Sequence, residues 1–492
     1  MNVDKLKNHG SLYHLHHLYP YWIKSFFLLI VILTTCLLSC QQNDDREESD
    51  SITNTSLSDK VDGYRGIWFT LGQFSEYGDK YSGGLGTYTA NHIPLAIYAE
   101  ETDKTFFVYG GTKGPEDRYL LVMASYYDHE NHRVPRPTIV HDKEGVDDPH
   151  DNPSIAIDGD GHIWVFVSGR GTGRPGFKYR SVEPYSVEEF ELVAEQELTY
   201  PQPWWIEGKG FIHLFTKYTR GRELYFETSS DGYEWSEDQK LAGIRGHYQV
   251  SSVINGKIGS FFNRHPEGSV DQRTDLYYVQ TTDFGQTWTT VDGQPLEIPL
   301  ETEDNPARVI EYSARDRLQY TVDLNWDKNG NPILLYVTSE GHQPGPDNEP
   351  RFWEIAHWSG SEWKNHIVAR SDHNYDLGSL YVFDDRWLII GPLGVGPQAW
   401  GTGGEMEMWE SRDEGKTWRK IRQITVNSER NHKFARRPVN AKDPFFVFWA
   451  DGNPDEMSIS RLYFGDSSGE KYWALPYDME EEYAEPRRVK PN

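Results

Sequence analysis

Cysteine is nearly absent from this chain of 492 residues, which contains only Cys36 and Cys40. From residue 41 onward the chain can therefore form no internal disulfide, and it offers no thiolate nucleophile or cysteine ligand for zinc. Positive charge is also scarce, since 76 Asp and Glu residues oppose 49 Lys and Arg, for a formal charge of −27. General nucleic-acid binding needs a basic face, so the composition argues against that class.

Long amphipathic helical segments and several enzyme motifs are missing too. No GxGxxG or phosphate-binding loop lies between a strand and a helix, and the chain has no HExxH and no GxSxG. Aromatic residues, in contrast, make up 14% of the chain, with 44 Gly and 27 Pro. Disordered and coiled-coil chains are poor in aromatic and turn residues, so the composition indicates a turn-rich, all-β protein.

The N-terminal region has the features of a bacterial export signal. An apolar run of about 14 residues, 25–38, is too short for a spanning helix, which needs roughly 20, but fits a signal peptide. The run ends in Leu-Leu-Ser-Cys, which resembles a lipobox with Cys40 as the lipidated residue. We predict a signal peptide over 1–39 and an acidic, flexible tether over 40–60 in an outer-membrane lipoprotein, at the cell surface or the periplasmic face. An uncleaved anchor helix is the alternative.

A short apolar strand preceded by a turn recurs seven times at steps of 46 to 74 residues, which predicts a propeller or another repeat array. Each copy is rich in β-branched or aromatic residues, as strands are. The copies are residues 104–110, 161–167, 210–216, 256–262, 330–336, 385–391 and 445–449. We predict a single seven-bladed β-propeller over 61–480 with less than a tenth helix, a last blade closed by an N-terminal strand near 63–68, and a polar tail over 481–492.

Two turns strengthen the prediction of a propeller. Residues 281–288 and 411–418 both fit the pattern S/T-x-D-x-G-x-T-W of an Asp box, and 229–235 and 357–363 are degraded copies. In such a turn the Asp caps backbone amides, the Gly adopts a positive φ and the Trp packs between sheets. Asp283 and Asp413 are therefore expected to be structural.

Polar residues gather between the predicted strands, where a propeller places its central depression. His129 ends one strand and His150 lies in Asp147-Asp-Pro-His-Asp-Asn-Pro153, 21 residues later, so both could face the axis. Further candidates, each equally explained by salt bridges or stacking at a blade edge, follow other inner strands: Tyr200, Lys217, Arg220, His247, Tyr248, Arg264 and His265. His92, in Asn-His-Ile-Pro, could also reach the axis or cap a strand.

Taken together, segments 106–111, 126–129, 147–153, 168–171, 199–204, 215–224 and 275–285 resemble the BNR-repeat polysaccharide lyases, a group of seven-bladed propellers that includes the ulvan lyases of marine bacteria. The resemblance covers roughly residues 60–460. It implies β-elimination at a uronic acid: a base removes the C5 proton, a cation neutralises the carboxylate, and an acid assists the departure of the C4 oxygen.

The resemblance also implies roles for the candidates. His129 is the principal base or acid, and His150 completes the histidine pair and holds the substrate carboxylate. Tyr248 and Tyr200 are candidates for the partner phenol, since His and Tyr suit proton transfer. Four residues are expected to bind substrate, among them a carboxylate clamp: Lys217, Arg220, His247 and Arg264. No cofactor is required, and His265 is a candidate ligand of a structural divalent cation.

Two other functions fit the sequence. A glycoside hydrolase on the same propeller would need two carboxylates beside the scissile bond, and Asp and Glu are abundant. A non-catalytic, surface-anchored glycan-binding lipoprotein would need only the aromatic residues. The expected partners are an anionic polysaccharide and, through the lipid, a membrane, with the protein itself a monomer that does not bind nucleic acid.

Overall fold

The computed structural model describes residues 58–86 and 91–490, and nearly all of their regular structure is β-strand. The predicted leader, Cys40 and most of the tether lie outside the described residues. Helical structure in the described part of the chain is limited to five one-turn 3₁₀ helices: η1 (Glu100–Thr102), η2 (Pro149–Asp151), η3 (Pro266–Gly268), η4 (Ser313–Arg315) and η5 (Pro346–Asn348). The low helix content agrees with the prediction. None of the helices in the described ranges is long and apolar enough to cross a membrane.

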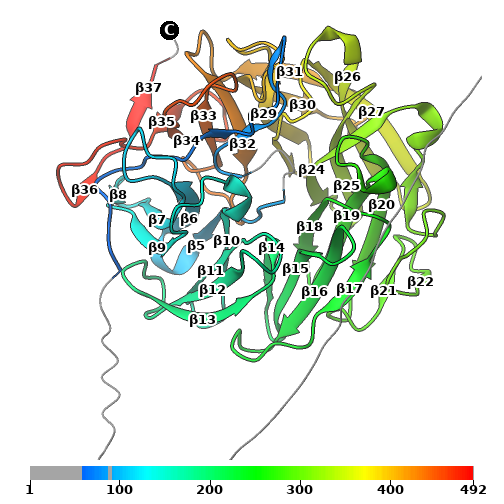
Figure 1. Ribbon diagram of the computed structural model, residues 1–492, viewed down its shortest axis with the longest axis horizontal. Coiled ribbons are helices and arrows are strands. Elements are labelled where there is room, and N and C mark those ends of the chain that lie inside the picture. The colour runs from blue at the N-terminus through cyan, green and yellow to red at the C-terminus, as the bar shows by residue number, and fades with distance from the viewer. Residues whose placement is uncertain (1–57, 87–90, 491–492) are drawn as a thin grey trace, which may run out of the picture. The chain divides into compact units, whose positions relative to one another are not determined.

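Seven antiparallel sheets follow one another along the chain and are arranged around a common axis (Figure 1). The first three blades contain β5 (Ala96–Ala99), β6 (Lys104–Gly111), β7 (Leu121–Asp128) and β9 (Thr138–Asp142); β10 (Pro153–Ile157), β11 (Ile163–Val167), β12 (Gly176–Ser181) and β13 (Phe190–Gln196); and β14 (Thr199–Ile206), β15 (Gly210–Tyr218), β16 (Arg222–Ser229) and β17 (Gln239–Ala242). The fourth contains β18 (Gln249–Ile254), β19 (Lys257–Arg264), β20 (Thr274–Thr281), β21 (Trp288–Thr289), β22 (Pro295–Leu296) and β23 (Arg308–Ile310).

The last three blades complete the ring. They contain β24 (Leu318–Trp326), β25 (Pro332–Ser339), β26 (Arg351–Trp358) and β27 (Trp363–Ser371); β28 (Ser379–Val382), β29 (Trp387–Gly394), β30 (Glu405–Ser411) and β31 (Arg419–Gln423); and β32 (Asn431–Arg436), β33 (Val447–Gly452), β34 (Leu462–Gly465), β35 (Tyr472–Ala474) and β37 (Arg487–Val489). Each of the seven predicted strand copies coincides with the second strand of a blade. The fold class predicted from the sequence is confirmed.

The closure of the ring differs from the prediction. The N-terminal residues near 63–68 do not add a strand to the last blade; Gly66 makes only isolated bridges to Gly111 and Ser460, between the first and last blades. Residues 481–490 are not a separate tail either. β36 (Tyr483–Ala484) pairs with β8 (Val134–Pro135), and β37 is the fifth strand of the last blade. The C-terminal segment therefore links the last blade to the first.

The Asp-box turns join third and fourth strands, as expected of structural turns. In the first box, Asp283 accepts hydrogen bonds from the backbone N–H (2.9 Å) and hydroxyl (2.6 Å) of Thr287, and Gly285 has a φ of +85°. Trp288 is buried and its ring lies 5.2 Å from that of Phe226 in the third blade. These turns therefore connect the packing of one blade to the next.

Short paired strands precede the first blade. β1 (Phe69–Thr70) pairs with β4 (Ser82–Gly83), and β2 (Phe74–Ser75) pairs with β3 (Gly78–Asp79). We call residues 69–83 the N-terminal strap.

Candidate functional site

The beginnings of the first strands bring polar and aromatic residues together at one end of the propeller axis. Each blade's first strand runs in the same sense, so the residues just before or at its start converge. Tyr200 is central: its ring centroid lies 5.4 Å from that of His92, 5.9 Å from His150 and 5.8 Å from Tyr248. These four residues come from four successive blades. With His265, Arg222 and Arg273 we call them the axial cluster.

Tyr200 owes its position to a local irregularity of β14. The register between β14 and β15 shifts between Thr199 and Gln202, and Tyr200 has a φ of +55°. A bulge of this kind re-aims a side chain, and non-glycine residues with positive φ concentrate at functional sites. The backbone N–H of Tyr200 donates to Ser168 Oγ at 3.0 Å. This bond replaces the hydrogen bond between strands that the N–H group loses at the bulge.

His150 is held by an acid two residues before it. The one-turn helix η2 begins after Asp148, whose carboxylate accepts the backbone N–H of His150 at 3.0 Å and also bonds to Nδ1 of its ring. Arg170 and Arg174 approach the same carboxylate at 2.9 and 2.7 Å. Burial alone would raise the pKa of Asp148, but His150 and these hydrogen bonds hold it well below its usual range. A carboxylate of this kind fixes the orientation of the imidazole of His150.

His92 is a buried neutral imidazole. Its Nε2 lies 3.0 Å from the carbonyl oxygen of His150, so Nε2 carries the proton and donates it. Burial lowers the pKa of His92 to about 3. Its Nδ1 is buried and makes no hydrogen bond to any described residue. The sequence left open a capping role for His92, and the structure instead places it beside Tyr200.

Arginine guanidinium groups surround Tyr248 on the other side of the cluster. Arg273 Cζ lies 4.8 Å from the centroid of Tyr248, and also close to Tyr320 (4.9 Å) and Tyr375 (5.0 Å). Arg222 Cζ lies 5.8 Å from the Tyr248 ring. Burial would lower the pKa of Arg273, but the neighbouring phenols more than offset this and raise it, so the group is a permanent cation.

The N-terminal strap covers this end of the axis. Phe69 lies with its ring 6.5 Å from that of His150. Lys80 forms an ion pair with Asp271, and the hydroxyl of Tyr81 donates to the same carboxylate at 2.6 Å. His150 and Tyr248 are 1% and 0% exposed, so a ligand can reach them only if the covering residues move.

His129 does not join the axial cluster. It follows the end of β7, where Asp128 pairs with Lys104 at the start of β6, whereas His150 lies near the opposite end of β6. Eight residues of strand span roughly 25 Å. His129 Nε2 bonds to Thr105 Oγ1 at 2.8 Å, and burial lowers the pKa of His129 to about 4. The prediction that His129 and His150 both face one site is therefore wrong.

The four predicted substrate-binding residues also lie away from the axial cluster or already bond to other groups of the protein. Lys217 Nζ is 2.9 Å from Asp238, and Arg264 binds Asp275 (2.6 Å) and Glu303 (3.1 Å). Both ring nitrogens of His247 bond to backbone at 2.8 Å, since Nε2 accepts from Ile244 N–H and Nδ1 donates to the carbonyl of Asn263. Arg220 lies in an exposed turn. The structure thus does not bring the four predicted substrate-binding residues into the axial cluster, where the guanidinium groups beside Tyr248 are those of Arg222 and Arg273.

The surroundings of His265 do not fit a divalent cation. Both of its ring nitrogens are buried without a hydrogen-bond partner, and its ring lies 4.7 Å from that of Tyr248. Burial, together with the positive charges of Arg273 and Arg222, lowers the pKa of His265. Nowhere in the described ranges do three or more His, Cys, Asp or Glu side chains form a group able to hold a metal ion. His265 is therefore a member of the axial cluster rather than a metal ligand.

For three members of the cluster, Arg222, Arg273 and His92, the sequence predicted no catalytic or binding role. Arg222 and Arg273 stood in polar runs beside the residues that were chosen, and His92 stood before a strand. The usable signal was position: His92, His150 and Tyr248 all occur within four residues of the start of a first strand, whereas His129 follows a third strand.

Comparisons with known proteins agree with the fold. Residues 115–371, more than half of the chain, match the model of a BNR repeat-containing family. No curated protein matches the sequence. Among solved structures, a polysaccharide lyase described as a PL25 ulvan lyase matches with a TM-score of 0.64 and 14% identity, covering 84% of this chain and 96% of the other; one structure of it holds -[GlcA(1-4)Rha3S]-.

The polysaccharide lyase Uly1 also matches, with a TM-score of 0.55, 13% identity, and coverage of 85% and 97% of the two chains. At these identities the similarity concerns the fold. The repeat found in the sequence, the seven sheets of the structure and the family model agree. The chain is a seven-bladed β-propeller that belongs to the BNR repeat-containing family.

Proposed function

We propose that this protein is a polysaccharide lyase that cleaves a uronate-containing, sulfated polysaccharide of the ulvan type by β-elimination. The observation that carries the proposal is the composition of the axial cluster, which gathers imidazoles, phenols and guanidinium groups from successive blades. β-Elimination needs these groups: a base for C5–H, a cation for the carboxylate and an acid for O4. The fold shared with the two lyases supports the same conclusion.

Each member of the cluster has a role in this proposal. The guanidinium groups of Arg222 and Arg273, together with His150 held by Asp148, bind the substrate carboxylate and make the C5 proton more acidic. Tyr200, which lies between His92, His150 and Tyr248, transfers the proton. As the C5–H bond breaks, the phenolate oxygen of Tyr200 takes the proton, the electron pair of that bond forms the C4=C5 double bond, and the C4–O4 bond breaks. O4 leaves with the proton that Tyr200 has taken or with the hydroxyl proton of Tyr248.

The hydrolase alternative would need two carboxylates beside the bond. Asp148, the carboxylate bonded to His150, is already paired with Arg170 and Arg174. The cluster itself consists of His, Tyr and Arg side chains. This difference in side-chain chemistry favours elimination over hydrolysis.

The deciding experiment follows the ultraviolet absorbance of unsaturated uronate during digestion of ulvan. We expect absorbance to rise with the wild type and to fall by a factor of about 10² to 10⁴ in Tyr200→Phe, which removes one hydroxyl and preserves the ring. The matched control is Tyr233→Phe, at an exposed position of the third blade. New reducing ends without absorbance would establish a hydrolase, and retention without cleavage a binding protein.

We further propose that Cys40 carries a lipid and holds the enzyme in the outer membrane. The support is the lipobox after an apolar run of signal-peptide length. Cys40→Ser should move the protein from the membrane fraction to the soluble fraction. Persistence in the membrane fraction would favour an uncleaved anchor helix instead.

A further inference from the structure

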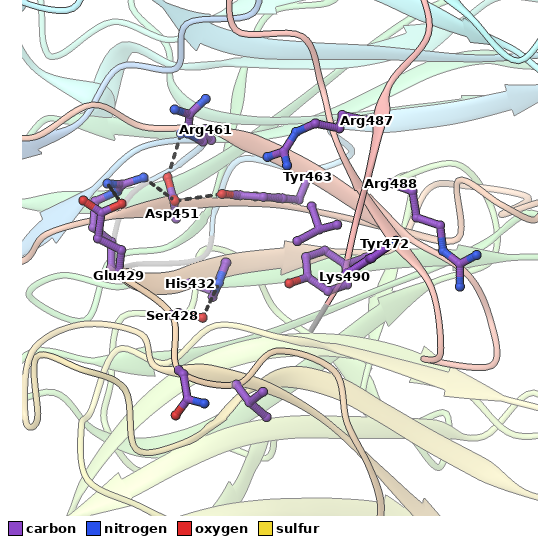
Figure 2. A pocket seen from close by; sticks show the side chains of 14 residues that line it. Ser428, Glu429, His432, Asp451, Arg461, Tyr463, Tyr472, Arg487, Arg488 and Lys490 are labelled. Atoms are coloured by element: carbon purple, nitrogen blue, oxygen red, sulfur yellow. Dashed lines mark hydrogen bonds and ion pairs between the residues drawn. The ribbon is translucent and has the colours of Figure 1, made fainter. Parts of the chain in front are cut away.

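A pocket of about 670 Å³ lies at the edge of the seventh blade, where the loop from Val426 to Arg430 faces the C-terminal strand β37 (Figure 2). Five of its lining residues are basic and only two are acidic. The basic residues are Arg430, Arg461, Arg487, Arg488 and Lys490, and the acidic ones are Glu429 and Asp451. In a chain with a net charge of −27 this is a local excess of positive charge.

Both acids of the pocket contact the same guanidinium, that of Arg430. Asp451 forms an ion pair with Arg430 at 3.0 Å, accepts the backbone N–H of Arg461 at 2.7 Å and accepts the hydroxyl of Tyr463 at 2.9 Å (Figure 2). Glu429 lies 3.0 Å from the other terminal nitrogen of Arg430. The two carboxylates are therefore held at Arg430, and the five basic and two acidic lining residues leave a net positive charge in the pocket.

Those remaining cations have no acidic partner within the described part of the chain. Arg487, Arg488 and Lys490 lie on or beside the edge strand β37 without an ion pair, and the guanidinium of Arg461 stacks over Tyr477 at 5.1 Å instead. In Figure 2, Arg487 points toward Tyr463 and Arg461. Many other surface arginines of this protein do pair, as Arg412 and Arg419 do with Glu410.

The floor of the pocket consists of buried side chains that contact one another. Arg430 is 8% exposed, and its Nε is buried without a partner in the described residues. His432 receives a hydrogen bond from Trp449 Nε1 at 3.0 Å, and Tyr463 stacks on Trp449 with centroids 5.7 Å apart. A fixed floor with cations at its rim can hold an anion without first ordering itself.

We propose that this pocket is a second binding site for the anionic polysaccharide, one that holds the chain by anionic oxygens on its sugars, either sulfate esters or uronate carboxylates. Arginine suits both groups, because its planar guanidinium donates in pairs. The site rests on the proposed function for the identity of the polymer, while its binding chemistry is separate from elimination.

The position of the pocket fits a polymer that also reaches the axial cluster. The loop before β32 and the end of β33 line the pocket, and Asn431 pairs with Gly452 at that end of the blade. First strands begin at this end in every blade, so the pocket and the axial cluster share it. A chain held at the blade edge would raise the local concentration of polymer at the axis.

The test uses Arg487→Ala/Arg488→Ala, at two exposed positions, and the matched control Arg412→Ala/Arg419→Ala, which removes the same charge from the neighbouring blade. Binding is measured at low salt by affinity electrophoresis in gels containing ulvan, desulfated ulvan, polygalacturonate or neutral dextran. Elimination is measured on a short ulvan oligosaccharide and on the polymer. Melting curves verify that both variants are folded.

We expect the pocket variant to bind ulvan about tenfold more weakly, with its rate on the short oligosaccharide unchanged and its rate on dilute polymer reduced. Loss of retention on desulfated ulvan alone would identify sulfate as the ligand, and retention on polygalacturonate would identify carboxylate; both support the site. Equal retention of the pocket and control variants would overturn it, as would absence of wild-type retention in every anionic gel. Retention without elimination would overturn the lyase assignment and leave the site standing.

Discussion

The two ends of the blades carry different kinds of residue. At the end where first strands begin, the chain places the axial cluster, with His150 bonded to Asp148 and flanked by Tyr200. At the opposite end lie the turns between third and fourth strands, including the Asp boxes. His129 belongs to this second end and follows Asp128, whose carboxylate accepts the backbone N–H groups of Glu130 and Asn131 at 3.0 and 2.9 Å.

Asp128 therefore does in the first blade what Asp283 does in the fourth: it caps the turn that follows a third strand. His129 is a buried residue of that turn, fixed by Thr105. The comparison teaches that position within the blade decides the role of a histidine here. One end is built from capped turns that hold the propeller together, and the other from polar side chains that the strands bring to the axis.

The largest expected effect separates the two histidines. His150→Ala removes a group to which we assign binding of the substrate carboxylate in the proposed function, and we expect the initial rate on ulvan to fall by about 10² to 10⁴. His129→Ala removes a residue of the opposite end, and we expect a rate within about threefold of wild type after correction for the folded fraction. The measurement is the initial rise in absorbance of unsaturated uronate. Equal losses in the two variants would break the comparison.

The fold could be predicted because its signals are local. Each second strand is a short apolar run after a turn, and each Asp box fixes its own backbone through Asp283 or Asp413. Seven copies along the chain then predict a propeller or another repeat array, because one blade alone cannot bury its faces.

The site could be predicted only in part, because it depends on the direction of strands. Between His129 and His150 the chain passes through the two-residue strand β8 and then through β9, the fourth strand of the blade, which carries it from one end of the blade to the other. A sequence separation of 21 residues suggested a return to the same end, which would need two such strands. The structure brings three of the predicted residues, His150, Tyr200 and Tyr248, together near the starts of first strands.

The closure of the ring was not predictable from local pattern. β37 contains Arg487, Arg488 and Val489 and has none of the apolar character of a buried strand. It pairs at an edge, where polar side chains face solvent and hydropathy carries no signal. The same residues form the rim of the cationic pocket.

The second prediction concerns stability in acid, to which both ends contribute. Burial lowers the pKa of His92 to about 3 and of His129 to about 4, against 6.5 in an unfolded chain. Between these values and pH 6.5 the unfolded state binds more protons, so stability is fully present above pH 6.5 and is lost as pH falls toward 4. We expect the melting temperature to drop over that interval.

The variant His129→Gln tests this assignment, since Gln can still bond to Thr105 but does not titrate. Its melting temperature should depend less steeply on pH between 6.5 and 4 than that of the wild type, with the rate at neutral pH unchanged. An unchanged slope would show that His129 does not contribute to the acid sensitivity and would leave His92 and the other buried histidines as its source.

The third prediction concerns the strap over the axial cluster. Asp271→Asn removes the charge that Lys80 and Tyr81 both contact, and leaves the buried ammonium of Lys80 without its counter-charge. We expect amides of residues 69–83 to exchange with deuterium faster, and the KM for ulvan to fall severalfold because the covering segment is displaced more easily. Mass spectrometry after deuterium labelling locates the change. Unaltered exchange in 69–83 would show that this ion pair does not hold the strap.

The smallest effect is expected for substitutions in the Asp-box turns, which should lower stability slightly and leave activity unchanged. Asp283→Ala removes two hydrogen bonds to Thr287 and should lower the free energy of unfolding by about 1 kcal/mol, the usual value of a lost capping side chain. Because the turn lies at the end away from the axial cluster, kcat and KM should stay at their wild-type values. Asp413→Ala, in the other intact box, makes the same two contacts to Thr417 and should behave alike. The unfolding midpoint in urea measures both, and a loss of activity larger than the loss of folded protein would mean that the capped turns do influence the chemistry at the opposite end.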